Sequence, residues 1–65
     1  MTILNRKVLI RLRIDKKLTV REMAKLMEMD SSSYWRRENG ETKFSEVDIV
    51  KLKKIFNVST EIFFE

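Results

Sequence analysis

The chain has 65 residues, which is enough for one small domain, predicted over residues 1–65, and leaves no room for a second function. It contains no cysteine and no histidine, which excludes disulfides, cysteine nucleophiles and the common zinc sites, so we expect no metal or cofactor. Fourteen lysines and arginines against ten acidic residues give a net charge of +4, which favours a polyanionic partner over an acidic substrate.

The first predicted helix covers about residues 5–15. Asn5 can cap its start, because a short amide side chain accepts a bond from a free backbone N–H. Its apolar residues are Leu9, Leu12 and Ile14. The cations expected in solvent are Arg6, Lys7 and Arg11. This helix is expected to act as a scaffold for the segments that follow.

Two short helices joined by a tight turn come next, over about residues 20–28 and 31–39. Thr19 and Glu22 form a capping box, a pairing in which each side chain satisfies a free backbone donor at a helix start. The apolar side of the first helix is made by Met23, Ala24, Leu26 and Met27. Asp30 can cap the second helix, and Gly40 closes it.

The helix over 31–39 has two different faces when its residues are placed at about 100° intervals. Tyr34, Arg37 and Glu38 point one way. The opposite face consists of Ser31, Ser32, Trp35, Arg36 and Asn39, and it has no aliphatic residue. Hydroxyls, an amide, an arginine and an aromatic edge suit the base edges of a DNA groove. The alternative is a polar surface helix whose Trp35 lies flat on a neighbouring element.

The last part of the chain predicts two more helices, over about residues 46–56 and 60–64. Ser45 and Asp48 form a second capping box, and Ser59 can cap the final segment. The residues expected in the core are Val47, Val50, Leu52, Ile55, Phe56, Val58, Ile62 and Phe63. Lysines 51, 53 and 54 are expected on a solvated face. Phe64 is one aromatic more than the core needs, which indicates either a self-association surface or simple packing.

The run E-M-A-x-x-M-x-M-D-x-S-x-Y-x-R-x-E-N-G, from Glu22 to Gly40, resembles the helix-turn-helix of the phage Cro and repressor family. Flanking pieces match as well: Leu12-Arg13 with Lys16 and Leu18-Thr19 upstream, and Phe56-Asn57-Val58-Ser59 with Glu61-Ile62-Phe63 downstream. The resemblance implies an all-α, compact five-helix, lambda-repressor-like DNA-binding domain. In that family an arginine at the position of Arg13 pairs with the Glu of the E-N-G turn, here Glu38, and a basic loop residue such as Lys43 contacts phosphate.

Four residues depart from the family pattern. Glu28 stands where the turn usually has glycine, so it must adopt a positive φ or reshape the turn. Val20 replaces a glutamine that often binds phosphate, and Arg37 replaces an apolar residue. Phe44 stands where proline is common, and we expect it in the core.

Together these features predict a sequence-specific regulator that binds double-stranded DNA as a homodimer on an inverted repeat, of the phage or mobile-element repressor or Cro type. The base-reading candidates are Ser31, Ser32, Trp35 and Arg36, and the phosphate-binding candidates are Arg21, Asn39 and Lys43. Phe64 is placed at the dimer interface.

The alternative is a protein-binding adaptor or antitoxin-like module that uses Trp35 and Phe64. Catalysis has little support without histidine, cysteine or a Gly-rich phosphate loop, and no small-molecule substrate is expected. No apolar run could span a membrane or form a signal peptide, so a cytoplasmic location is expected.

Overall fold

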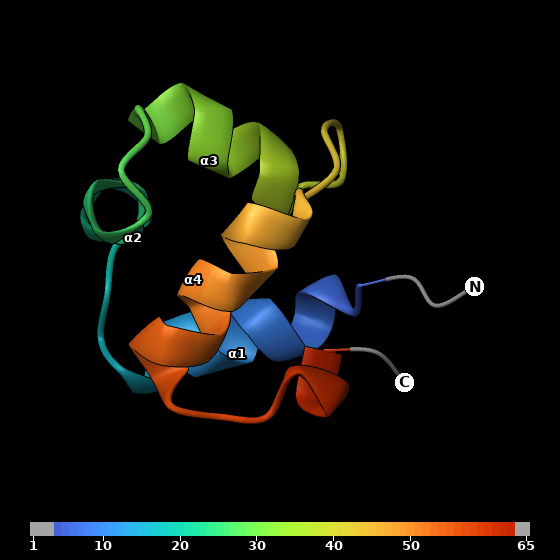
Figure 1. The fold of residues 1–65 in the computed structure, drawn as a ribbon. Helices are drawn as coiled ribbons and strands as arrows, with labels where there is room; N and C mark the ends of the chain where they lie inside the picture. Colours follow the sequence, from blue (N-terminus) through green and yellow to red (C-terminus); the bar gives the residue numbers. More distant parts are fainter. Residues whose placement is uncertain (1–3, 64–65) are drawn as a thin grey trace.

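The computed structural model describes residues 4–63, and within that range the chain forms four α-helices, one short 3-10 helix and no strand. The elements are α1 (Arg6–Asp15), α2 (Val20–Leu26), α3 (Ser31–Glu38), α4 (Glu46–Phe56) and η1 (Thr60–Phe63). Figure 1 shows α2 end-on beside α3, with α4 crossing between them and the layer of α1 and η1. The all-α prediction is confirmed, but the five-helix count is wrong, because residues 60–63 form a 3-10 turn.

Each α-helix of the described range begins at the capping residue that the sequence predicts. Asn5 accepts a bond from the Lys7 N–H at 3.1 Å, and Asp30 accepts from the Ser33 N–H at 3.2 Å. Both predicted capping boxes are present, at Thr19 with Glu22 and at Ser45 with Asp48. These side chains fix where the helices start, because each one satisfies a backbone donor that has no partner inside the helix.

The α-helices end at residues with a positive φ, namely Lys17 (59°), Glu28 (60°), Gly40 (86°) and Asn57 (53°). At Glu28 the N–H donates to the Lys25 carbonyl at 3.1 Å and the Met29 N–H donates to the Ala24 carbonyl at 3.0 Å. This pair of bonds is a Schellman motif, which stops a helix by satisfying its last carbonyls. The predicted ends at 28 and 39 were therefore too late, because α2 ends at Leu26 and α3 at Glu38.

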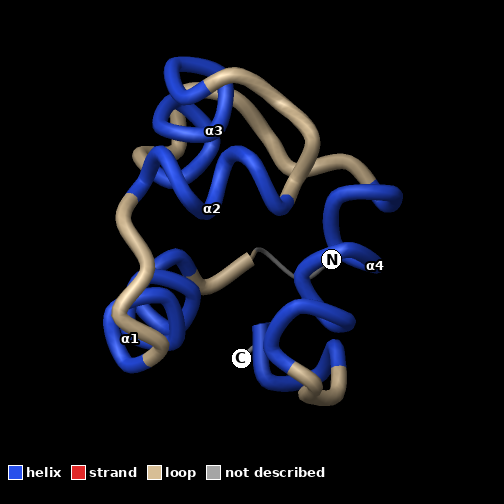
Figure 2. The backbone as a smooth tube through the Cα atoms, turned by 90° about the vertical axis from the view of Figure 1, so that its left-hand side faces the viewer, coloured by secondary structure: helices blue, strands red, loops and turns tan. Residues whose placement is uncertain are grey.

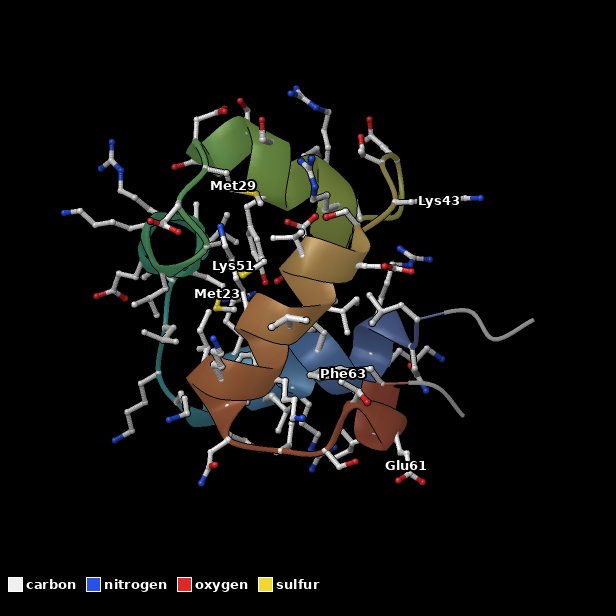
Figure 3. All side chains as sticks on the ribbon, in the orientation of Figure 1. Met23, Met29, Lys43, Lys51, Glu61 and Phe63 are labelled. Carbon is white, nitrogen blue, oxygen red and sulfur yellow. The ribbon has the colours of Figure 1, made fainter. Side chains whose placement is uncertain are left out.

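The core draws on all five elements. Its buried residues are Leu9, Met23, Ala24, Met27, Tyr34, Leu52, Phe56 and Phe63. Phe63 closes the core against α1, and its carbonyl accepts the Asn5 N–H at 2.6 Å (Figure 3). Phe44 is partly buried, and its ring meets the Tyr34 ring edge-on with centroids 6.3 Å apart.

The predicted buried face of α4 was partly wrong. Val47 and Val50 are 64% and 48% exposed, whereas Leu52 and Phe56 are buried as predicted. The reason is that Asp48 faces inward, so the positions three to four residues along share its side while Val47 and Val50 rotate outward. Ile14, Leu26 and Ile62, which were also expected to be apolar contacts, are exposed as well.

Candidate nucleic-acid interface

Helices α2 and α3 pack against each other and are joined by the turn at residues 27–30. Figure 2 shows the two helices as neighbours, with α1 below them. Glu28 takes the positive φ that this turn requires, so the missing glycine changes the cost of the turn and not its shape. The arrangement is a helix-turn-helix, with α3 as the second helix.

Lys51 fastens this turn to α4. Its ammonium donates to the Met27 carbonyl at 3.1 Å and lies 3.1 Å from the Glu28 carboxylate. Figure 3 shows the Lys51 side chain directed toward the α2 and α3 pair. Lys51 was predicted to lie on a solvated face, and that prediction was wrong, because the open carbonyl at the end of α2 provides a partner that the sequence pattern does not reveal.

The inner side of α3 is fixed to α1 by a shielded ion pair. Arg13 donates to both carboxylate oxygens of Glu38, at 2.9 and 3.2 Å, and to the Leu18 carbonyl at 2.8 Å. The two side chains are only 14% and 8% exposed. The Tyr34 hydroxyl donates to the same Glu38 carboxylate at 2.5 Å. Burial, together with that bond to Glu38, raises the pKa of Tyr34 above its ordinary range.

A second pair fixes α3 to α4. Arg37 donates to Asp48 at 3.3 Å and to the Ser33 carbonyl at 3.0 Å. Asp48 also accepts from the Ser45 N–H at 2.9 Å, so one carboxylate serves as the helix cap and as the partner of Arg37. Arg37 was noticed in the sequence as a departure from an apolar position. Its partner Asp48 was not predicted, because it lies 11 residues further along the chain.

The end of α3 is held by Arg6, which the sequence pattern placed in solvent. The Arg6 guanidinium is exposed, yet it donates to the Asn39 carbonyl at 2.5 Å. It also lies over Gly40, where an added Cβ would stand 2.8 Å from the Arg6 Cζ atom. A cation at this place is favourable because the C-terminal carbonyls of a helix carry partial negative charge.

The outward side of α3 carries the base-reading candidates. Ser31, Ser32, Trp35, Arg36 and Asn39 are all exposed. Trp35 is 50% exposed, so its ring is neither in the core nor fully free. Within residues 4–63 the Arg36 side chain makes no hydrogen bond and no ion pair, which leaves its donors available to a ligand, whereas the neighbouring Arg37 is engaged.

The start of α3 is a cluster of hydrogen bonds on Asp30. Its carboxylate accepts from the Ser32 hydroxyl, from the Ser33 hydroxyl at 2.7 Å and from the Ser33 N–H at 3.2 Å. The Ser32 and Ser33 hydroxyls hold the pKa of Asp30 well below its usual range. The exposed N-cap of α3 therefore carries a negative charge, and the free cation Arg36 lies on the outward face of the helix further along.

The phosphate-binding candidates lie at separate places. Arg21 is exposed on α2, and Lys43 is exposed on the loop after α3, with its amine directed away from the body of the protein (Figure 3). The backbone near Asn39 was expected to donate to phosphate, but the N–H groups of residues 39–42 already donate to carbonyls of α3. Only the exposed Asn39 side chain is left for that role. Phe64, the dimer-interface candidate, lies outside the described residues.

Within residues 4–63 no helix is long and apolar enough to cross a membrane. The same part of the chain contains no group of three or more acidic side chains placed to hold a metal ion.

The second helix of this helix-turn-helix is polar, is held by ion pairs on its inner side and is exposed to solvent on its outer side. These features define the class of protein as a DNA-binding domain. The comparison with known families agrees: the model of the helix-turn-helix domain family matches residues 8–61, which is most of the chain. The chain therefore belongs to the helix-turn-helix domain family. No curated protein matches the sequence, and no solved structure matches it either. The match is to the general helix-turn-helix family and not to phage Cro and repressor proteins in particular.

Proposed function

We propose that this protein is a sequence-specific transcriptional regulator of the phage or mobile-element repressor or Cro type, acting as one domain over residues 1–65. One observation carries the proposal most directly. Helix α3 is fixed on its inner side by the pairs Arg13–Glu38 and Arg37–Asp48, while its outer side shows only polar and aromatic groups to solvent. A rigid helix with an open polar face is suited to the major groove, which is wide enough to admit it.

In this proposal each outer side chain of α3 contacts a different group in the major groove. Arg36 donates two hydrogen bonds to O6 and N7 of a guanine, which is the commonest specific contact in the major groove. Trp35 places its edge against a thymine methyl group or a sugar. Ser31 and Ser32 meet base edges at the first turn of the helix, where reading helices enter the groove.

Contacts to the DNA backbone set the register of the domain without selecting a sequence. Arg21 and Lys43 supply cations on either side of α3, and the Asn39 carboxamide supplies a neutral donor. These contacts are expected to make binding strongly dependent on salt, because each neutralised phosphate releases condensed counterions.

The alternative, a protein-binding adaptor or antitoxin-like module, is favoured by a different observation. Val47 and Val50 stand on the outer side of α4 with 64% and 48% of their surface exposed, and Trp35 is half exposed on α3. Exposed apolar side chains are more typical of a protein contact than of a DNA contact.

A gel shift separates the two functions. The protein is titrated first against random duplex and then against duplex selected from a random library, each at two salt concentrations. The regulator requires salt-sensitive binding to both duplexes and a clear preference for the selected one. Absence of binding to any duplex at low salt would leave the protein-binding function as the better conclusion.

A further inference from the structure

The Ser32 hydroxyl at the start of α3 is exposed but is not free to rotate. It lies within hydrogen-bond distance of Asp30, whose carboxylate also caps the helix by accepting from the Ser33 N–H at 3.2 Å. An ionised carboxylate can only accept hydrogen bonds. The single hydrogen of the Ser32 hydroxyl must therefore point at Asp30.

This bond changes what Ser32 can offer to a ligand. A free serine hydroxyl donates or accepts equally well, so it discriminates poorly between base edges. With its hydrogen held by Asp30, the Ser32 oxygen presents only lone pairs to solvent. The neighbouring Asp30 carboxylate, itself exposed, also presents only lone pairs. At the first turn of α3 the Ser32 and Asp30 oxygens are thus both limited to accepting hydrogen bonds.

We propose that Ser32, oriented by Asp30, is a specificity-determining residue that selects a base with an exocyclic amino group in the major groove. The inference rests on the proposed DNA-binding function and adds the chemistry of one base position. Cytosine N4 and adenine N6 are the amino donors available in that groove. Guanine O6 and N7 and thymine O4 are acceptors, so at the same position they could form no hydrogen bond with the Ser32 and Asp30 oxygens.

The base that Ser32 selects should lie at a fixed distance along the duplex from the guanine that Arg36 contacts. Ser32 and Arg36 are four residues apart on α3, which corresponds to about 6 Å along the helix at about 1.5 Å per residue. Successive base pairs are separated by about 3.4 Å along the duplex. The amino-bearing base should therefore lie within about two or three base pairs of the guanine that Arg36 reads.

The test is selection from a random duplex library with four proteins: the parent, Ser32→Ala, Asp30→Gly and Ser33→Ala. Ser33→Ala is the matched control, because it also removes a hydroxyl from Asp30 but stands off the outward face. The parent should enrich adenine or cytosine at one position near the Arg36 guanine. Ser32→Ala should lower that preference by about two- to ten-fold, the value of one hydrogen bond, and Ser33→Ala should leave it unchanged.

Asp30→Gly tests the orientation itself. One Asp30 oxygen accepts both the Ser32 hydroxyl and the Ser33 N–H, so an asparagine that kept the cap would still accept from Ser32. Glycine is a tolerated cap and removes the acceptor, which frees the Ser32 hydroxyl hydrogen and should admit guanine or thymine at the same position. Removing a negative charge should also strengthen binding to every sequence, so the measured quantity is the base preference and not the affinity.

Three results would overturn the inference. An unchanged profile for Ser32→Ala, or a Ser32-dependent position that prefers guanine or thymine in the parent, would do so while leaving the proposed function intact. A parent that enriches no sequence would remove the proposed function together with the inference. The parent library therefore distinguishes one failure from the other.

Discussion

The Lys51 ammonium lies 3.1 Å from the carboxylate of Glu28, the residue that turns the chain between α2 and α3. Its stronger partner is the Met27 carbonyl, because that group is held by the backbone while the Glu28 side chain is 76% exposed. An ion pair with so exposed a member adds little stability. A charged hydrogen bond to a fixed helix-end carbonyl adds more. Lys51 therefore connects the end of α2 to α4.

The first prediction concerns Lys51→Met, which keeps the length of the side chain and removes the ammonium. It should lower the free energy of unfolding by about 1 to 2 kcal/mol, chiefly through the lost bond to the Met27 carbonyl. Glu28→Gln is the control, and it should cost less than about 1 kcal/mol because only the exposed pair is weakened. Urea denaturation measures both. Equal losses in the two variants would show that the ion pair, and not the carbonyl bond, holds the turn.

The second prediction is that Glu28→Gly stabilises the protein. Glu28 has φ 60°, a region that costs an L-residue about 1 to 2 kcal/mol, while glycine enters it freely but loses more chain entropy on folding. The free energy of unfolding should rise by about 0.5 to 1 kcal/mol, as measured by thermal or urea denaturation. Lys17→Gly is a matched case, with φ 59° at the end of α1. A loss of stability in both variants would mean that side-chain contacts at these positions outweigh backbone strain.

Local sequence patterns predict some features of this fold and not others. The capping residues, the helix order and the two faces of α3 follow from local rules, because each depends on residues three or four apart. The roles of Arg37 and Lys51 depend on partners 11 and 24 residues away, and no local pattern contains them. The exposure of Val47 and Val50 has the same origin. Hydrophobicity alone favoured burying them, but the bond between Asp48 and Arg37 sets the rotation of α4.

The third prediction uses the only tyrosine in the chain. Tyr34 is fully buried and donates to Glu38, and both effects raise its pKa in the folded protein. A raised pKa means that the neutral form stabilises the fold below the unfolded value of about 10 and that this stability is lost as the pH rises above it. Tyr34→Phe should lower the free energy of unfolding by about 1 to 2 kcal/mol at pH 7, because the hydrogen bond to the charged Glu38 is missing.

The difference in free energy of unfolding between the parent and Tyr34→Phe should become smaller above pH 10. Urea melts at pH 7, 9 and 11 measure the difference, and because lysines titrate in both proteins their contribution cancels. A constant difference over that range would show that Tyr34 ionises as easily in the folded protein as in the unfolded chain.

The fourth prediction separates base reading from phosphate binding. Arg36→Ala should weaken binding to the preferred site by about 1 to 3 kcal/mol and flatten the preference at one base pair. Lys43→Ala should weaken binding to all duplexes alike and lower the salt slope by about one unit per protomer. Competition gel shifts at several salt concentrations measure both. If Arg36→Ala weakens every sequence equally, Arg36 contacts phosphate; if the slope is unchanged in Lys43→Ala, the loop stays off the DNA.

The last prediction is that the protein acts on DNA as a homodimer. One α3 can contact only about four or five base pairs, too few to distinguish an operator among the very large number of competing genomic sites. Two protomers related by a two-fold axis double the reading surface, and their reading helices stand about 34 Å apart, one turn of duplex. The selected site should therefore be an inverted repeat with that spacing.

A small interface between the protomers would be enough, because DNA holds both copies close together and supplies part of the association energy. Sedimentation of the free protein can then show a monomer without contradicting the dimer. The decisive measurement is the stoichiometry on the selected duplex, with Phe64→Ala beside the parent. The parent should bind cooperatively as two protomers, and the variant should bind with less cooperativity. One protomer on an asymmetric site would exclude the dimer and the interface role proposed for Phe64.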